Sequence, residues 1–319
     1  MFFLLFQVGK QYNLGVNEFL NLAILYNLIA FATQFLVGLI VDKYKIPKHT
    51  VILGIILATI SLSLFFISPA SAIVLVCFGN SLLHVGGGVI SIKTTPNKAT
   101  APGIFVAPGA LGLALGILLG KADGFPILLF AISLLVIAVL IHKLVEVPEY
   151  QLPKKPISLT NLKIIVIAFL LFTIATRSIV GLSLNLPWRN SSFLIILTAT
   201  VIMLGKAMGG IIGDRVGWVK TGIIALFVSA PLISFTTNLF FASIIGIFLF
   251  EFTMPITLAA IAKNLPGREG LAFGLTTLIL VLAALMVSPF NLFTITDTFV
   301  FLLIIASAGT FFIGLDLAT

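Results

Sequence analysis

Three ionisable residues, His84, Arg177 and Glu251, lie near the middle of long apolar segments, away from any loop. A charged side chain at the centre of a membrane-spanning helix costs about 2.5 to 3.5 kcal/mol, so it normally faces a partner charge or a water-filled cavity. Burial and a nearby opposite charge both change the proton affinity of a carboxylate. These residue types could therefore exchange protons, through Glu251 and His84, and bind an anionic group, through Arg177.

An internal duplication relates two of these residues. When Gly103 is aligned with Gly270, the offset is 270 − 103 = 167, and the same offset places His84 on Glu251. A base and an acid then occupy equivalent positions in repeated segments, as expected for carriers built from duplicated helix sets. The hypothesis is that Glu251, with His84, exchanges protons with the two sides of a membrane. Arg177 would alternately pair with Glu251 or with an anionic group of the substrate.

Structural roles remain open for the same side chains. Arg177 and Glu251 could form a static buried ion pair, and His84 could donate to a backbone carbonyl at a close helix contact. We expect Lys206 to extend its ammonium group to the lipid headgroups and to lie outside the site. Further polar residues could bind substrate or could simply join helices by hydrogen bonds. They are Tyr26, Asn27, Asn80, Ser81, Asn185 and Thr253.

Composition identifies the elements that must position these groups. The chain is 60% hydrophobic and 9% charged, with a mean hydropathy of +1.25, whereas soluble domains carry about 25% charged residues. Its apolar runs are long enough to cross a bilayer as helices, which satisfy their own backbone hydrogen bonds. The sequence therefore predicts an all-α membrane protein. The twelve predicted spans are 1–9, 17–41, 50–68, 70–92, 102–120, 124–143, 162–186, 190–213, 219–235, 239–262, 270–288 and 293–315.

The distribution of basic residues predicts the orientation. Of the 18 lysine and arginine residues, 13 fall in loops that face the cytosol if the amino terminus does, 3 fall in the opposite loops and 2 lie within spans. This positive-inside bias places both termini in the cytosol, in a multi-pass protein of the cell (inner or plasma) membrane. The cations form no contiguous groove, which argues against nucleic acid as a partner.

A proline-rich polar stretch, residues 146–161, divides the chain. It is a predicted cytosolic linker between an N-terminal six-helix half, 1–145, and a C-terminal six-helix half, 162–319. Cys77 is the single cysteine and lies in an apolar run, so the chain has no internal disulfide or thiolate metal cluster. We expect no metal and no cofactor.

Two loop motifs stand half a chain apart. Thr33 to Lys48 aligns without a gap with Gly205 to Lys220, and both copies end an apolar segment with Gly, then Asp four residues on, then a cation. The pattern resembles the loop motif of the major facilitator superfamily, although Lys45 stands where the family has Gly. The matching residues are Gly38, Asp42 and Lys43 in the first copy and Gly210, Asp214, Arg215 and Gly217 in the second.

This resemblance implies a 12-helix bundle of two pseudo-symmetric halves of six helices. In the family, spans one, four, seven and ten line the central cavity, which would gather His84, Arg177 and Glu251 around one pathway. The motif's Asp and cation would hold helix ends together on the cytosolic side and let them separate during alternating access. Asp42 and Asp214 could instead be ordinary solvated loop charges.

A second resemblance lies in span five. Gly103, Pro108, Gly109 and Gly112 are similar to the superfamily's antiporter motif. Pro108 removes a helix hydrogen bond and the glycines allow close approach of a neighbouring helix, which predicts a bendable, tightly packed contact suited to an exporter. A plain glycine-rich packing face is the alternative. The segment Gly79 to Gly88, with Arg177 and Ser178, is similar to the fosmidomycin-resistance branch of the family.

The first span is shorter than its counterpart. Arg177 precedes Gly205 by 205 − 177 = 28 residues, and the same spacing before Thr33 reaches Leu5, so Leu162 to Phe172 have no equivalent. We expect the first helix to be truncated at its amino-terminal end. An amphipathic segment lying at the membrane interface is the alternative.

The functional expectation is a secondary active transporter and not an enzyme. Nucleotide-binding, zinc-protease and nucleophile-elbow motifs are missing from the sequence. We expect a monomer that carries out proton-coupled antiport or efflux of a small anionic or amphiphilic solute, with protons and the bilayer as its other partners. A proton-coupled importer, a non-transporting receptor that keeps the carrier fold, and an intramembrane enzyme that uses His84 and Glu251 remain alternatives.

Overall fold

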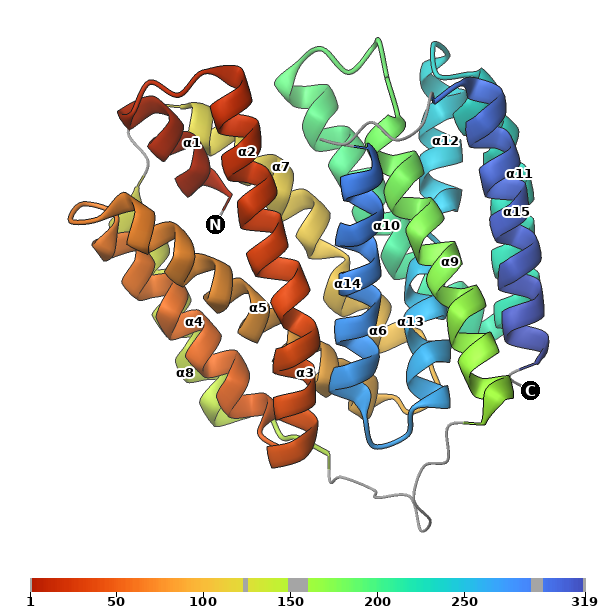
Figure 1. Cartoon of the computed structure of the whole chain (residues 1–319), viewed down its shortest axis with the longest axis horizontal. Helices are drawn as coiled ribbons and strands as arrows, with labels where there is room; N and C mark the ends of the chain where they lie inside the picture. Colours follow the sequence, from red (N-terminus) through yellow and green to blue (C-terminus); the bar gives the residue numbers. More distant parts are fainter. Residues whose placement is uncertain (1, 123–125, 149–159, 288–294, 318–319) are drawn as a thin grey trace. The chain divides into compact units, whose positions relative to one another are not determined.

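The computed structural model describes residues 2–122, 126–148, 160–287 and 295–317, and these residues form helices joined by short loops (Figure 1). Among these described residues, eleven helices are long and apolar enough to cross a membrane. The elements are α1 (Phe3–Gln11), α2 (Val16–Asn27), the π-helix η1 (Leu28–Ala32), α3 (Thr33–Tyr44), α4 (Pro47–Leu64), α5 (Pro69–Thr94), α6 (Thr100–Val106), α7 (Pro108–Lys121), α8 (Ile127–Leu144), α9 (Asn161–Ser183), α10 (Ser192–Val216), α11 (Trp218–Phe235), α12 (Phe240–Phe250), α13 (Thr253–Asn264), α14 (Glu269–Val287) and α15 (Asp297–Asp316).

The chain divides into two compact units. Unit 1 comprises Met1–Lys93, Gly112–Tyr150 and Arg268–Leu278. Unit 2 comprises Thr94–Leu111, Gln151–Gly267 and Ile279–Thr319. Each unit thus contains a short segment from the half of the sequence that supplies most of the other unit. Most of the predicted linker, 146–161, lies outside the described residues.

In unit 1, α4 packs along α8 (Figure 1). A second apolar core forms around α1. Leu4 and Leu5 of α1 are fully buried, and Gln7 Nε2 donates to the carbonyl of Gly120 in α7 at 3.0 Å. At 1.5 Å per residue, the nine residues of α1 extend about 14 Å, roughly half of a bilayer's hydrocarbon core. This element is the short first span that the sequence predicted.

The second span of unit 1 is not a uniform α-helix. A five-residue π-helix, η1, directly follows Asn27 and separates α2 from α3. The Thr33 hydroxyl, just after η1, donates to the carbonyl of Ile29 at 2.6 Å. Short π-helical insertions inside α-helices are frequent at functional sites, and this one adjoins the candidate residues Tyr26 and Asn27.

In unit 2, α15 packs against α9 and α11, while α10 packs against α6, α12 and α13 (Figure 1). Glycines make the second group of contacts possible. A Cβ placed on Gly209 of α10 would collide with the Cα of Phe252 and lie 2.5 Å from its carbonyl oxygen. The two backbones therefore meet directly, as small residues permit between membrane helices.

Replacing Gly209 by Ala should destabilise unit 2, because the added methyl group must push α10 away from the segment that carries Phe252. We expect a loss of about 1 to 3 kcal/mol, measured as a lower thermal midpoint of the purified protein. Gly181→Ala is the matched control, because a Cβ there has open space within 4 Å among the described residues. That control should be neutral or slightly stabilising, and an equal loss in both variants would contradict the argument.

Candidate functional site

A break in the tenth span places Glu251 between two helices. Helix α12 ends at Phe250 and α13 begins at Thr253, so the predicted continuous span 239–262 is interrupted. Pro255 has no N–H to donate to the carbonyl of Glu251, which accepts instead from the Met254 N–H at 3.2 Å. Discontinuous helices are where secondary transporters build their binding sites. Pro255 was the available sequence signal for this break.

Lys206 of α10 faces this break. Its Nζ lies 3.9 Å from Oε2 of Glu251, and the two side chains are only 17% and 15% exposed. The expectation that Lys206 reaches the headgroups is therefore wrong. Ten residues, or about 15 Å of helix, separate it from the end of α10 at Val216. Gly205 brings the helices together, since a Cβ there would lie 3.0 Å from Glu251 Cβ.

Arg177 of α9 completes what we call the charge cluster, Arg177, Lys206 and Glu251. Its side chain is buried, with the residue 9% exposed, and Nη1 has no hydrogen-bond partner among the described residues. Arg177 interacts electrostatically with both Glu251 and Lys206. Arg177 and Lys206 thus both interact electrostatically with Glu251, and Lys206 is the one that lies at ion-pair distance from it.

The candidate residues of unit 1 make local hydrogen bonds. His84 Nδ1 donates to the carbonyl of Asn80, one turn earlier in α5, at 2.9 Å, and its ring lies 6.4 Å from that of Phe31. The hydroxyl oxygens of Ser81 and Thr33 lie 2.9 Å apart, at hydrogen-bonding distance, which joins α5 to α3. These contacts are the kind that the structural alternative predicts for polar side chains inside spans.

Three other candidate residues have neighbours within their own unit. Asn27 Nδ2 donates to the carbonyl of Ala23 at 2.8 Å, and Tyr26 is buried in the unit 1 core. Asn185 lies two residues beyond the end of α9 and lines a separate pocket, described below, and so stands apart from the charge cluster. The predicted span 162–186 therefore extends three residues beyond the end of α9.

The two loop-motif acids hold helix starts in place. In unit 1, Asp42 accepts from the backbone N–H groups of Gly270 and Leu271, at 2.8 and 2.7 Å, at the start of α14. In unit 2, Asp214 accepts from the N–H groups of Ala99 and Thr100, both at 2.8 Å, at the start of α6. A carboxylate at a helix amino terminus satisfies free N–H groups and stabilises the helix dipole. Neither acid is a solvated loop charge.

Other motif residues have structural roles. A Cβ on Gly38 would collide with the carbonyl of Gly270, and a Cβ on Gly210 would lie 2.5 Å from that of Ala99, so these glycines let each Asp reach its helix. Gly217 ends α10 with a φ of +105°, a conformation that favours glycine. Among the motif cations, Lys43 lies over the ring of Tyr44 at 5.2 Å, and Arg215 is exposed.

Span five is interrupted at its proline, between Val106 of α6 and Pro108 of α7. Close packing occurs at Gly103, where a Cβ would lie 2.9 Å from the Lys206 carbonyl oxygen. At Gly109 and Gly112 a Cβ would meet no atom of the described structure within 4 Å. The motif's first glycine packs beside the charge cluster.

No protein-family model and no curated protein sequence matches this chain. Solved structures do. A variant of the E. coli fucose:proton symporter FucP superposes with a TM-score of 0.70 at 11% identity, covering 100% of this chain and 96% of FucP. FucP in the outward conformation, described as a major facilitator superfamily transporter, gives 0.66 at 13% identity, covering 100% and 97%.

The human organic anion transporter MFSD10 (TETRAN) gives a TM-score of 0.61 at 14% identity, covering 93% of this chain and 83% of that one. Identities this low carry information about fold alone. The helix succession, α1 followed by eleven long apolar helices, agrees with these neighbours. The chain therefore has the all-α, 12-helix fold of the major facilitator superfamily transporters.

Proposed function

We propose that this chain is a secondary active transporter that couples proton movement to the movement of a small organic anion by alternating access. The observation that carries the proposal is the buried charge cluster at the break between α12 and α13, in a fold whose solved neighbours are transporters. Ionisable groups inside membrane spans are costly and mark transport pathways. Catalysis is not part of the proposal.

The charge balance of the cluster supports an anionic substrate. When ionised, Glu251 compensates one of the two cations, Lys206 at 3.9 Å, and leaves the guanidinium of Arg177 available for a substrate carboxylate. At about 4 Å, two unit charges interact by on the order of 4 kcal/mol at an effective dielectric constant of about 20. Protonation of Glu251 would release Lys206 and remove the attraction between Glu251 and Arg177. The protonation state of Glu251 would in this way be linked to the binding of the anion.

The direction of transport separates two forms of the proposal. Antiport or efflux is suggested by the antiporter-like residues of span five, whereas symport is suggested by the likeness to a fucose:proton symporter. Both forms use the same cluster. Both termini of this cell-membrane protein would face the cytosol. An antiporter would then move the solute out of the cell in exchange for entering protons, and a symporter would bring both solute and protons into the cell.

Flux measurements in proteoliposomes test the proposal. Vesicles with an imposed pH gradient are offered radiolabelled monocarboxylates and amphiphilic anions, with protein-free vesicles as the control. An antiporter accumulates solute when the interior is acidic, and a symporter does so when the exterior is acidic. If no anion moves in either gradient, and counterflow without a gradient is also absent, transport is excluded and a receptor role is favoured.

Lys206→Met tests the charge balance. Without the second cation, Arg177 becomes the sole partner of Glu251, so a substrate anion must compete with the carboxylate. We expect the KM for a transported anion to rise about tenfold or more, equivalent to about 1.4 kcal/mol, with the pH dependence retained. Lys220→Met, which removes an exposed charge at the start of α11, is the control. An unchanged KM in Lys206→Met would contradict the role of the second cation.

A further inference from the structure

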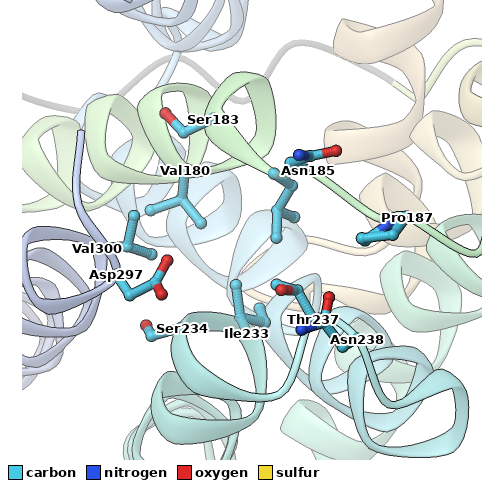
Figure 2. A pocket seen from close by; sticks show the side chains of 11 residues that line it. Val180, Ser183, Asn185, Pro187, Ile233, Ser234, Thr237, Asn238, Asp297 and Val300 are labelled. Carbon is cyan, nitrogen blue, oxygen red and sulfur yellow. The ribbon is translucent and has the colours of Figure 1, made fainter. Parts of the chain in front are cut away.

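A polar pocket at one end of unit 2 is independent of the charge cluster (Figure 2). Its volume is about 160 Å³, well above the roughly 10 to 15 Å³ that one water needs. The walls come from the ends of α9 and α11, the segments that follow them, and the first turn of α15. The positive-inside distribution of basic residues predicts that this end of the unit faces the outside of the cell.

The chemistry of the lining is acidic and rich in hydrogen-bond acceptors. Asp297 is the single charged residue among the lining residues, which include no lysine, arginine or histidine. Ser183 donates its hydroxyl proton to the carbonyl of Ile179 at 2.6 Å, so only its lone pairs remain for another partner. Asn185 and Asn238 add amide groups on the other side of the view from Asp297 (Figure 2). The pocket therefore suits a cation that carries hydrogen-bond donors.

An unsatisfied buried hydroxyl points to a missing ligand. Ser234 lines the pocket, is 2% exposed, and its Oγ has no hydrogen-bond partner in the described structure. Leaving a buried polar group unpaired is costly, and native proteins seldom do so. Most serines and threonines within these helices bond a carbonyl of the preceding turn, as Ser183 and Thr236 do. The Ser234 hydroxyl is thus an unsatisfied polar group in the pocket wall.

The pocket wall is held in a fixed position by Trp188. Its indole Nε1 donates to the carbonyl of Thr237, itself a lining residue, and to the Ser243 hydroxyl, both at 3.0 Å. The Trp188 ring also packs edge-on against Phe240, with centroids 4.9 Å apart. These bonds tie the segment after α9 to the segment after α11, so the polar groups are organised before any ligand arrives.

We infer that this pocket binds a primary ammonium group, with Asp297 as its counter-ion and the Ser234 hydroxyl as a hydrogen-bond acceptor. An ammonium group offers three N–H donors to an acceptor-rich cavity, and its bonds to a carboxylate are charge-assisted. The ligand is either a soluble amine or the headgroup of an amine-bearing lipid, both of which reach this end of a membrane helix. The site lies outside the pathway proposed for transport and stands independently of that proposal.

Tryptophan emission reports on the site, because Trp188 bonds to a pocket residue. The full chain, purified in detergent, is titrated with ethanolamine, and in parallel with choline and with sodium at equal ionic strength. We expect a saturable change with ethanolamine and at least about tenfold weaker responses to choline, which has no N–H donors, and to sodium. Equal responses to all three cations would overturn the inference, since charge screening alone would explain them.

Two substitutions and a control locate the binding. Asp297→Asn should weaken the apparent affinity about tenfold or more. Ser234→Ala should weaken it several-fold while leaving the thermal midpoint unchanged or raised, because it removes an unsatisfied buried group. A merely structural serine would lower that midpoint. Asp316→Asn changes the same charge at the other end of α15 and should have no effect. Unchanged affinity in Asp297→Asn would overturn the inference.

A comparison of two lipids identifies the source of the ammonium group. Thermal midpoints are compared in nanodiscs of phosphatidylethanolamine and of phosphatidylcholine, for the unmodified chain and for Asp297→Asn. A midpoint raised by phosphatidylethanolamine only when Asp297 is present assigns the site to a lipid headgroup, and a response to free ethanolamine alone assigns it to a soluble amine. If neither probe gives an Asp297-dependent response, the inference is wrong.

Discussion

Glu251→Gln should abolish solute accumulation driven by a pH gradient in proteoliposomes. Glutamine keeps the shape and hydrogen-bonding capacity of the side chain but can neither gain nor lose a proton at physiological pH. It also leaves Lys206, 3.9 Å away, without its carboxylate partner. We expect accumulation to fall by at least about tenfold, to the level of protein-free vesicles, while counterflow of labelled solute without a gradient continues.

Two further measurements separate this result from simple misfolding. Breaking a buried ion pair by removing one partner typically costs about 3 to 5 kcal/mol, so Glu251→Gln should also lower the thermal midpoint. Glu251→Asp keeps the charge and should retain a measurable gradient response. If Glu251→Gln lowers stability but accumulation still follows the pH gradient, Glu251 belongs to a static ion pair and the proton is carried elsewhere.

Asp214→Asn should destabilise unit 2 more than Asp42→Asn destabilises unit 1. The Asp214 carboxylate accepts from the backbone N–H groups of Ala99 and Thr100, the Thr100 hydroxyl at 2.5 Å and the Trp218 indole at 2.8 Å. Asparagine replaces one acceptor oxygen with a donor that faces other donors. Hydrogen bonds to charged groups contribute about 1.5 to 3 kcal/mol each, so we expect a loss of about 2 to 4 kcal/mol.

The measurement is the thermal midpoint at a fixed heating rate, with Asp42→Asn and Glu146→Gln as comparisons. Asp42 accepts from two backbone N–H groups, so its substitution should lower the midpoint by roughly half as much as that of Asp214. Glu146 is exposed, and its substitution should have little effect. Equal midpoints for Asp214→Asn and Glu146→Gln would show that these bonds do not stabilise the fold.

Helix breaks were only partly predictable. Pro108 lies within a predicted span, and the structure separates α6 from α7 directly before it. Pro255 carries the same signal, yet the span 239–262 was predicted as continuous, because the interruption falls four residues earlier, where the carbonyl of Glu251 loses its donor. The π-helix at Leu28–Ala32 has no comparable marker, since none of its five residues is a proline or a glycine.

The site was predictable as a set of residues but not as a geometry. Arg177 and Glu251 were identified because charges are rare in apolar spans, and in unit 2 the two charges interact electrostatically. Lys206 was assigned to the headgroups on its sequence position alone. The direction of the Lys206 side chain depends on the rotation of α10 about its axis. This rotation is fixed by the close contacts of Gly205 and Gly209 with the segment around Glu251.

By itself, the sequence determined the membrane class, the helix count and the position of the repeated motifs. These properties follow from local chemistry: the length of apolar runs, the spacing of Gly and Asp, and the absence of donors at proline. The tertiary structure alone decided which groups meet. Asp42 and its donors are 228 and 229 residues apart, and Lys206 and Glu251 lie on different helices. Such contacts depend on how closely helices pack and on which faces they turn toward each other, and hydropathy does not encode either property.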